Sequence, residues 1–310
     1  MNRYRDYNGY LRDLFGERVQ KISLDAGLGC PNRDGTISYN GCAYCDSLGS
    51  GSGACILKGM SVEEQVRKGI AFASRRYRAR KYIAYFQSFT NTYAPVETLR
   101  TLYESALAHS GMVGLSVGTR PDCAGDEVLD LLASYQEKVL VWVEYGLQSA
   151  HDVTLTSINR GHDSACFARA VQRTAQRGLN VCAHIILGLP GESREMMRET
   201  ARFLADLPVQ GVKIHALYII EGTAMARRFQ EGAFRCLSRE AYVDRVVDVL
   251  ERLPEKVVIQ RLTGDPPPGL KLLAPAWTLE KGRNLRRIQE RFEERDTWQG
   301  REVPGASQRE

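Results

Sequence analysis

The sequence predicts an α/β protein whose parallel strands form an incomplete (β/α)6 barrel. Three observations predict this fold class: six apolar, β-branched runs recur along the 310 residues, helix-like segments separate them, and unusual polar residues follow most of them. Near-continuous hydrophobicity is typical of parallel strands that are buried on both faces. Alternating strands and helices join into right-handed βα units of one sheet. A doubly wound sheet fits this alternation too, but special residues at successive strand ends favour the active face of a barrel.

The first half of the chain supplies three strands and three helices. Cys30, "QSFTN" and "GTRPD" each follow one of these strands. Ser61 and Glu64 have the spacing of a capping box, which predicts the start of the first helix. The expected strands are residues 21–26, 82–87 and 113–118, and the expected helices are residues 61–79, 96–109 and 126–136.

The second half continues the alternation up to about residue 255. "EYGLQS" and "GLPGE" again stand at strand ends. Gly178 comes directly after a helical repeat and predicts a helix stop. The expected strands are residues 139–145, 181–187 and 212–218, and the expected helices are residues 164–177, 193–206 and 238–252.

The chain divides into a partial barrel at residues 1–255 and a short C-terminal extension at residues 256–310. The extension opens with "RLTGDPPPGLKLLAPAW", which is too rich in proline for regular structure. A basic helix is expected to follow it. The last residues, "GREVPGASQRE", are polar and predict a disordered tail.

Composition points to a cytoplasmic protein without membrane association. No apolar run approaches the roughly 18 residues that a membrane-spanning helix needs, and the charged N-terminus lacks the apolar core of a signal peptide. We therefore expect reduced thiols. Eight cysteines in 310 residues are also too few for a disulfide scaffold.

The formal net charge is +5, and much of the positive charge is clustered in two segments, "RRYRARK" at 75–81 and "KGRNLRRIQERFEER" at 281–295. Two interpretations remain open. The segments are either solvated helix faces or an electrostatic footprint for a polyanion such as RNA.

Three cysteines stand in "LGCPNRDGTISYNGCAYCDS": Cys30, Cys42 and Cys45. A structural zinc site is normally closed by four protein ligands. The other cysteines, Cys55, Cys123, Cys166, Cys182 and Cys236, are isolated and form no second C-x-x-C pair. Three thiolates leave one metal position open, which suits an iron–sulfur cluster with one exchangeable iron. Zinc binding or simple packing is the alternative.

At this point the sequence resembles a known family. A three-cysteine motif after the first strand of a β/α barrel is similar to that of radical S-adenosylmethionine (SAM) enzymes. The usual spacing there is C-x3-C-x2-C, whereas this chain has C-x11-C-x2-C. The wider spacing resembles the bacterial YhcC/YtqA-like group and the radical SAM domain of the elongator catalytic subunit. "LDAGLGCPNRDGT", "FQSFTNTYAP", "VGTRPD", "EYGLQS", "NRGH", "HIILGLPGE" and "RLTGDPPPGLKLLAP" resemble the bacterial group, from about residue 4 to 280.

The resemblance implies a 4Fe–4S cluster held by Cys30, Cys42 and Cys45. SAM would bind the open iron through its amino and carboxylate groups. Reduction would then cleave SAM to methionine and a 5′-deoxyadenosyl radical, while the protein supplies orientation and excludes water. Only about 50 residues follow the barrel, which is too short for a typical domain, so we expect no acetyltransferase activity.

Tyr44 resembles the aromatic residue that packs near the adenine of SAM in this superfamily. A core tyrosine is the alternative interpretation. Gln87, Thr90 and Asn91 follow the second strand and can hydrogen-bond the methionine end of SAM. Their alternative role is turn formation, since asparagine and threonine favour loops.

Glu144 ends an apolar strand, where an unpaired carboxylate is costly. We expect it to contact the ribose or amino group of SAM, together with Gln148; a rim salt bridge is the alternative. Arg160 can pair with the SAM carboxylate through its planar guanidinium, or it can anchor a helix start. His184 is expected to be a satisfied core histidine. No residue is assigned to the chemistry on the substrate itself.

The resemblance implies modification of tRNA at the wobble-uridine side chain, with a one-electron reductant of the flavodoxin or ferredoxin type. Two alternatives remain. A radical SAM enzyme could act on a small metabolite, or the chain could be a non-catalytic, zinc-bound RNA-binding protein.

Overall fold

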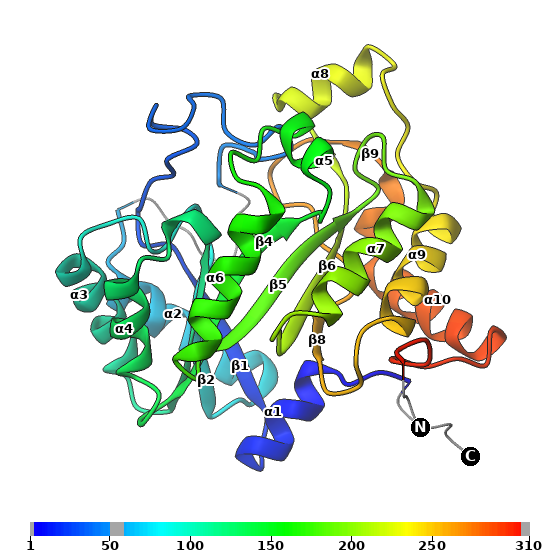
Figure 1. Cartoon of the computed structure of the whole chain (residues 1–310). Coiled ribbons are helices and arrows are strands. Elements are labelled where there is room, and N and C mark those ends of the chain that lie inside the picture. Colours follow the sequence, from blue (N-terminus) through cyan, green and yellow to red (C-terminus); the bar gives the residue numbers. More distant parts are fainter. Residues whose placement is uncertain (1–2, 50–58, 305–310) are drawn as a thin grey trace.

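The chain folds around a curled, half-open barrel of parallel strands (Figure 1). This computed structural model describes residues 3–49 and 59–304. Its seven-stranded sheet has the order β1-β2-β3-β4-β5-β6-β8. The strands are β1 Val19–Leu24, β2 Lys81–Phe86, β3 Met112–Thr119, β4 Leu140–Gln148, β5 Asn180–Leu187, β6 Gly211–Ala216 and β8 Val258–Arg261.

The α/β class and the partial barrel are confirmed, and all six expected strands are present. The sheet has one strand more than expected, because β8 pairs in parallel with β6. It spans only Val258–Arg261 and leads directly into the proline-rich segment. Such a short apolar run has no clear strand pattern, so the sequence did not predict this strand. It also lies beyond residue 255, so the first residues of the expected C-terminal extension complete the sheet.

Helices cover the outer, convex face of the sheet (Figure 1). The capping box at Ser61 is confirmed: its hydroxyl accepts the Glu64 N–H at 3.2 Å, and the Glu64 carboxylate accepts the Ser61 N–H at 3.0 Å. The covering helices are α2 Val62–Tyr77, α3 Val96–Leu107, α4 Asp126–Ala133, α6 Ser164–Gln176, α7 Arg194–Ala205, α9 Arg239–Glu251 and α10 Lys281–Glu294. Two shorter helices, α5 Asp152–Ser157 and α8 Ala224–Gln230, lie above the strand ends.

An N-terminal helix that the sequence analysis missed closes the lower end of the barrel. α1, Tyr7–Phe15, starts at Asp6, whose side chain accepts the Gly9 N–H. Tyr7 and Leu11 on this helix pack against Trp142 of β4 and Val258 of β8 inside the barrel. The barrel is therefore sealed at the start of its strands and open only where they end.

Two parts of the C-terminal segment are more regular than expected. Within the proline-rich run, β9 Leu272–Ala274 pairs with β7 Ile219–Ile220 in an antiparallel ribbon. Residues 300–304 of the expected disordered tail pack against α9, where the Glu302 N–H donates to the Glu251 carbonyl at 2.8 Å and Arg252 pairs with the Glu302 carboxylate at 2.6 Å. Residues 305–310 of that tail, and Cys55, lie outside the described residues.

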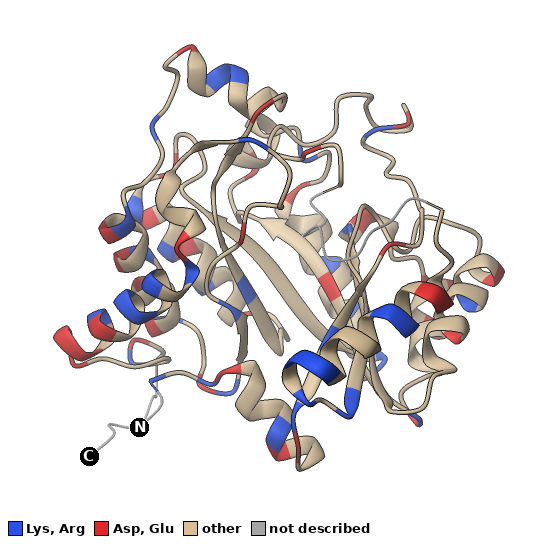
Figure 2. Ribbon diagram, turned by 180° about the vertical axis from the view of Figure 1, so that it is seen from behind, with Lys and Arg blue, Asp and Glu red and all other residues tan. Residues whose placement is uncertain are grey.

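The expected basic helix is confirmed as α10, but most of its charge is neutralised within the fold. Arg287 pairs with Glu240 at 2.9 Å and with Glu294 at 2.8 Å, and Arg291 pairs with Asp244 of α9. In Figure 2, blue and red residues alternate over the pair of helices α9 and α10.

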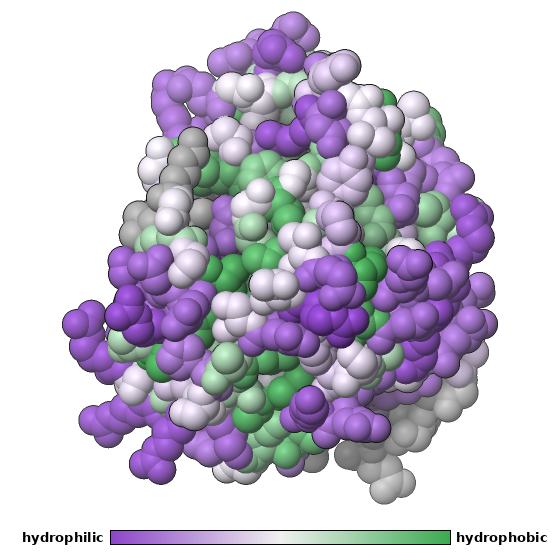
Figure 3. All heavy atoms as spheres, turned by 90° about the vertical axis from the view of Figure 1, so that its left-hand side faces the viewer, coloured by the Kyte–Doolittle hydropathy of each residue, from purple (hydrophilic) through white to green (hydrophobic). Residues whose placement is uncertain are grey.

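The side of the molecule that carries α2, α3 and α4 has a largely hydrophilic rim with hydrophobic side chains gathered in its middle (Figure 3).

Candidate active site

The three cysteines lie on one long loop between β1 and α2, above the open end of the barrel. Cys42 is buried, whereas Cys30 and Cys45 are half-buried. The loop is fixed from the side: the Asn32 amide donates to the Asn159 carbonyl at 2.7 Å, and the Ala43 N–H donates to the Ile158 carbonyl at 2.8 Å. The cysteine loop is thus held by the segment that follows β4.

A single cavity at the carboxyl ends of the strands joins the three thiols to most of the predicted site residues. Parallel strands of a barrel bring these ends to one face, where barrel enzymes carry their active sites. Tyr44, Gln87, Thr90, Glu144, Gln148 and Arg160 all line this cavity together with Cys30, Cys42 and Cys45. Asn91 does not line it: it is buried behind the wall and its amide donates to the Gly118 carbonyl at 2.8 Å.

Cationic groups surround the thiol of Cys42. Arg160 Nη1 lies 3.4 Å from Cys42 Sγ, and the Asn32 amide nitrogen lies 3.6 Å from the same sulfur. Burial alone would raise the pKa of the Cys42 thiol, but the guanidinium groups of Arg160 and Arg120 outweigh burial and lower it. The site therefore favours a thiolate, the form that binds iron.

The three thiols do not belong to the one compact group of metal-ligating side chains found among the described residues. Three thiolates on one zinc lie within about 4 Å of one another, because each Zn–S bond is about 2.3 Å. Among the described residues, the one group of three His, Cys, Asp or Glu side chains whose ligand atoms lie within 4.8 Å of one another is Glu144, Cys182 and His184.

The wall beside the cysteines has unsatisfied polar atoms that suit a bound ligand. Thr90 Oγ1 is buried without a hydrogen-bond partner in the described residues, and the Asn91 side-chain oxygen behind it is also unpaired. Buried polar groups are normally hydrogen-bonded, so an unpaired hydroxyl on a cavity wall is a candidate ligand contact. Three thiols and these groups fit a 4Fe–4S cluster with SAM bound beside it.

The end of β4 is shaped to bring Gln148 and Arg160 together. The pairing with β5 shifts between Gly146 and Gln148, and Gln148 has a positive φ of 74°. Such bulges and strained backbones cluster at functional sites. A Cβ at Gly146 would lie 2.5 Å from the Gln148 amide nitrogen and 2.7 Å from Arg160 Nη2. Only glycine leaves room for this approach, in which Arg160 Nη2 donates to the Gly146 carbonyl at 2.7 Å.

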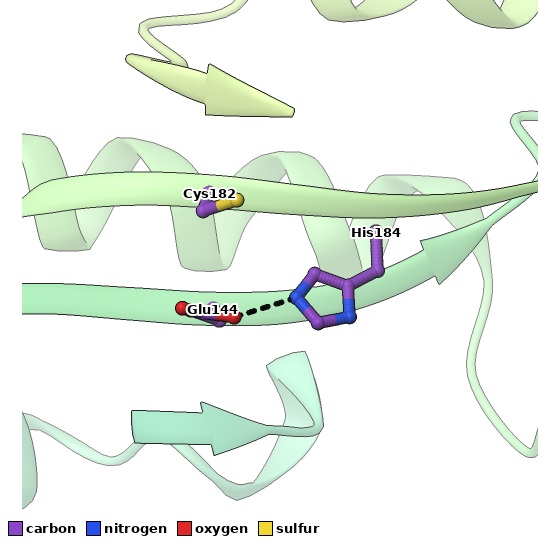
Figure 4. Close-up of side chains that lie close together, drawn as sticks. All are labelled: Glu144, Cys182 and His184. Carbon is purple, nitrogen blue, oxygen red and sulfur yellow. Dashed lines mark hydrogen bonds and ion pairs between the residues drawn. The ribbon is translucent and has the colours of Figure 1, made fainter. Parts of the chain in front are cut away.

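Glu144 lies deeper in the barrel, and its carboxylate is engaged by the protein itself. Oε1 accepts from Lys21 Nζ at 2.7 Å and from the Ser116 hydroxyl at 2.8 Å. Oε2 accepts from His184 Nε2 at 2.8 Å, drawn in Figure 4, and from Lys213 Nζ. The expected contact between Glu144 and SAM stays a prediction, and the structure adds four protein partners to it.

The charges of this cluster follow from burial and mutual contact. Burial alone would raise the pKa of the Glu144 carboxyl, but Lys21 and Lys213 outweigh it and hold that pKa well below its usual range. Burial lowers the pKa of Lys213 to about 7, although Glu144 opposes the shift. Burial and the charge of Lys213 lower the pKa of His184 to about 4, so this histidine is neutral at pH 7.

The side chains of Glu144, Cys182 and His184 in Figure 4 lie as close together as the ligands of a metal ion, but the charges around them disfavour a cation. Two lysine ammonium groups already contact the carboxylate. Burial, together with the negative charge of Glu144, also raises the pKa of the Cys182 thiol well above its usual range. A cation would have to displace both lysines and a thiol proton, so the group is better described as a buried ion-pair cluster.

Several functional candidates were missed by sequence reasoning: Lys21, Arg120, Lys213, His215 and Arg261. Arg120 stands in the quoted "GTRPD" motif, where its Nη1 donates to the Arg160 carbonyl at 2.9 Å. Lys213 stands in the apolar strand "VKIHALY". The rule that directed attention to Glu144, that a buried charge needs a partner, could have identified Lys213 in the same way.

Comparisons with known proteins agree with this geometry. Residues 27–204 match the family model described as the Radical SAM superfamily, and residues 209–294 match the Radical_SAM C-terminal domain. The chain therefore belongs to the radical SAM superfamily. Membership implies an enzyme whose cofactors are an iron–sulfur cluster and SAM.

Similar curated relatives confirm the resemblance to the YhcC/YtqA-like group. The chain is 44% identical to YtqA of Bacillus subtilis over 96% of this chain and 92% of that protein, and 40% identical to YhcC of Escherichia coli K12 over 87% and 86%. A tRNA uridine(34) acetyltransferase of Dehalococcoides mccartyi is 28% identical over 56% of this chain and 37% of its own length.

Among solved structures, the archaeal Methanocaldococcus infernus Elp3 matches with a TM-score of 0.68 and 17% identity, covering 91% of this chain and 64% of that one. This likeness supports the fold alone. Within the described part of the chain, none of the helices has the length and apolar character needed to span a membrane.

Proposed function

We propose that this protein is a radical SAM enzyme that modifies the wobble-uridine side chain of tRNA. The observation that carries the proposal is the convergence of three thiols and the predicted SAM-binding residues on one cavity at the strand ends. When bound, the cluster would supply the electron that cleaves SAM to methionine and a 5′-deoxyadenosyl radical. Cys30, Cys42 and Cys45 would hold the cluster, and Arg160 would stabilise the Cys42 thiolate.

The residues on the wall have distinct roles in this proposal. Tyr44 would pack near the adenine of SAM, and Gln87 and Thr90 would bind its methionine end. Asn91 would act from behind the wall, through its unpaired side-chain oxygen. Gln148 would contact the ribose. Because the open end of the barrel is the route to the cavity, the target carbon would enter from the side of α5 and α8.

The tRNA substrate is supported by the relative named a tRNA uridine(34) acetyltransferase and by the basic run at 75–81. Arg75, Arg76 and Arg80 are exposed, and no salt bridge to a carboxylate is found for them among the described residues. The run precedes β2, so it lies at the opposite end of the sheet from the cavity. It would bind the RNA backbone at a distance from the reacting nucleoside.

A small metabolite is the second candidate substrate, and one observation favours it. The cations of α10 are largely paired within the fold, so only one of the two expected basic segments remains free for RNA.

We further propose a cytoplasmic location, where thiols stay reduced, and a reductant of the flavodoxin or ferredoxin type. The division at residue 255 also remains a proposal.

Anaerobic reconstitution tests the enzyme class. Iron and sulfide should give a brown protein that, once reduced, converts SAM to 5′-deoxyadenosine. A colourless protein with one tightly bound zinc would support the zinc-bound RNA-binding alternative instead.

Nucleoside mass spectrometry of bulk tRNA from a deletion strain tests the substrate, because the proposal requires a changed wobble uridine. Unchanged tRNA nucleosides would favour the small metabolite.

The basic run makes a separate prediction about RNA affinity. Replacing Arg75, Arg76, Arg78 and Arg80 by glutamine should weaken tRNA binding and reduce the slope of log K against log salt by about 0.7–0.9 per lost phosphate contact, because fewer counterions are released. SAM cleavage without RNA should be nearly unchanged, since the run is remote from the cavity. Filter binding across a salt series measures both quantities.

A control for this experiment changes charge elsewhere on the surface. Arg173 is half-buried and Arg202 is exposed, and they pair with Asp126 and Glu195, each at 2.7 Å. Their replacement by glutamine should leave the slope of log K for tRNA binding against log salt unchanged. A wild-type slope near zero, or an equal slope in the 75–80 variant, would remove this run from the RNA proposal.

A further inference from the structure

The cavity has two halves with different chemistry. One half, at the ends of β1 to β4, holds the cysteines and the predicted SAM-binding residues. The other half lies at the ends of β5, β6 and β8, where His215, Tyr218, Arg261 and Asp265 line the wall. This second half has no role in cofactor binding in the function proposed above, and it is where a substrate could meet the cofactor.

The second half and the floor beneath it carry an excess of positive charge. Lys21, Lys213 and Arg261 are three cations, and Glu144 is the one carboxylate that contacts the two lysines. Lys213 and Arg261 stand opposite each other on β6 and β8, so they project on the same side of the sheet. The Asp265 carboxylate does not offset this charge, because it pairs with Lys281 at 2.5 Å.

Hydrogen-bond donors on this wall lack partners. Among the described residues, no hydrogen bond or salt bridge is found for the Arg261 guanidinium, although five N–H donors form its planar fork. His215 Nε2 is buried without a partner as well. An unpaired guanidinium beside the buried Lys213 is electrostatically unfavourable unless an anion binds there.

We propose that this half of the cavity binds an anionic group of the substrate, a carboxylate or a phosphate, with Arg261 as its principal ligand. The guanidinium offers two parallel N–H donors that match the oxygens of either group. His215 and Tyr218 stand on the same wall to complete the contacts. The inference rests on the proposed function, because it places the anion next to a SAM molecule held in the first half.

Anion binding can be measured directly on the reconstituted holoenzyme. The cluster is kept oxidised and SAM is saturating, so that SAM is not consumed and its own carboxylate site is filled. The affinity for anions is then measured by equilibrium dialysis at constant ionic strength, once with radiolabelled inorganic phosphate and once with radiolabelled acetate. Because the carboxylate site of SAM is filled, the affinity is that of the second half of the cavity. The cluster absorbance shows that each variant is folded.

Wild-type protein should bind at least one of the two anions, and the preferred one identifies the substrate group as a phosphate or a carboxylate. Arg261→Gln should weaken this binding at least tenfold. Arg261→Lys should lie between the two, because it keeps the charge but loses the planar fork. Arg286→Gln is the matched control, since Arg286 is exposed on α10 outside the cavity, and it should bind like wild type.

Two results would overturn the inference: no binding of either anion by wild type, or equal binding by wild type and Arg261→Gln. Equal anion binding together with a tenfold loss of SAM affinity in Arg261→Gln would assign Arg261 to the cofactor. Failure of the proposed function has a different signature, namely no 5′-deoxyadenosine from reduced wild type. Dialysis does not require SAM cleavage, so the two failures are distinguishable.

Discussion

Replacing Cys42 by alanine is expected to remove the cluster and abolish SAM cleavage. The thiolate is one of three proposed protein ligands, and a methyl group cannot bind iron. Cys30→Ala and Cys45→Ala should have the same effect, because two remaining thiolates leave two irons without protein ligands. Iron and sulfide analysis should fall from about four of each per chain to near zero. The brown absorbance and 5′-deoxyadenosine formation should disappear together.

Cys236→Ala is the matched control for these three variants. Cys236 lies beside the apolar cluster that includes Ile186 and Leu217, and burial raises the pKa of its thiol to about 11. It is a small packing residue, so its loss should leave iron content and SAM cleavage unchanged. A Cys42→Ala protein with a full cluster and normal SAM cleavage would show that the ligand assignment is wrong.

Much of the barrel could be predicted because its strands are long and apolar. The six expected strands were confirmed to within a few residues, since a parallel strand buried on both faces has an uninterrupted apolar sequence. β8 has only four residues and α1 is polar on its exposed side. Neither has a strong local signal. Both are fixed by tertiary contacts, β8 by pairing with β6 and α1 by packing Tyr7 and Leu11 into the barrel.

The site was predicted unevenly for a similar reason. Residues within short motifs, such as Cys42 in "CAYC" and Gln148 in "GLQS", were found because the motif itself carries the chemistry, and the structure brings both to the cavity. Lys21 and Lys213 are separated by almost the whole sheet, and nothing in the sequence states that they meet at Glu144. Such a three-way contact is set by strand order and register, which the sequence does not display.

The ion pairs of α10 show the same limit for surface charge. The segment 281–295 has the composition of an RNA-binding helix, but whether its cations are free depends on the neighbouring helix. Asp244 and Asp248 of α9 pair with Arg295 at 2.5 Å and 2.9 Å. A basic run in a sequence therefore counts toward a polyanion site only after the carboxylates that face it are known.

Glu144→Gln is expected to destabilise the fold by about 3 kcal/mol at pH 6, because removing one partner leaves a buried charge uncompensated. In wild type, Lys213 is protonated below pH 7 and pairs with Glu144. Without the carboxylate, the folded lysine must give up its proton, whereas the unfolded lysine keeps it up to about pH 10.4. The unfolded state then binds more protons, so the variant loses stability as pH falls.

The destabilisation should therefore shrink from pH 6 to pH 9, where Lys213 is neutral in both folded proteins. Urea unfolding at pH 6, 7.5 and 9 measures this trend. The double variant Glu144→Gln with Lys213→Met is the control, because removing both charges of a buried pair is often nearly neutral. It should recover much of the lost stability at pH 6. A pH-independent loss, or no recovery in the double variant, would contradict the charge explanation.

The same variant also tests the expected contact with SAM. If Glu144 binds the ribose or amino group of SAM, Glu144→Gln should weaken SAM binding at pH 9 as well, where the fold is least affected and the cluster is retained. If its role is to hold Lys21, Lys213 and His184 in place, SAM affinity should follow stability and recover in the double variant. Calorimetric titration with SAM at both pH values separates the two roles, because only a direct contact is lost independently of the lysine charge.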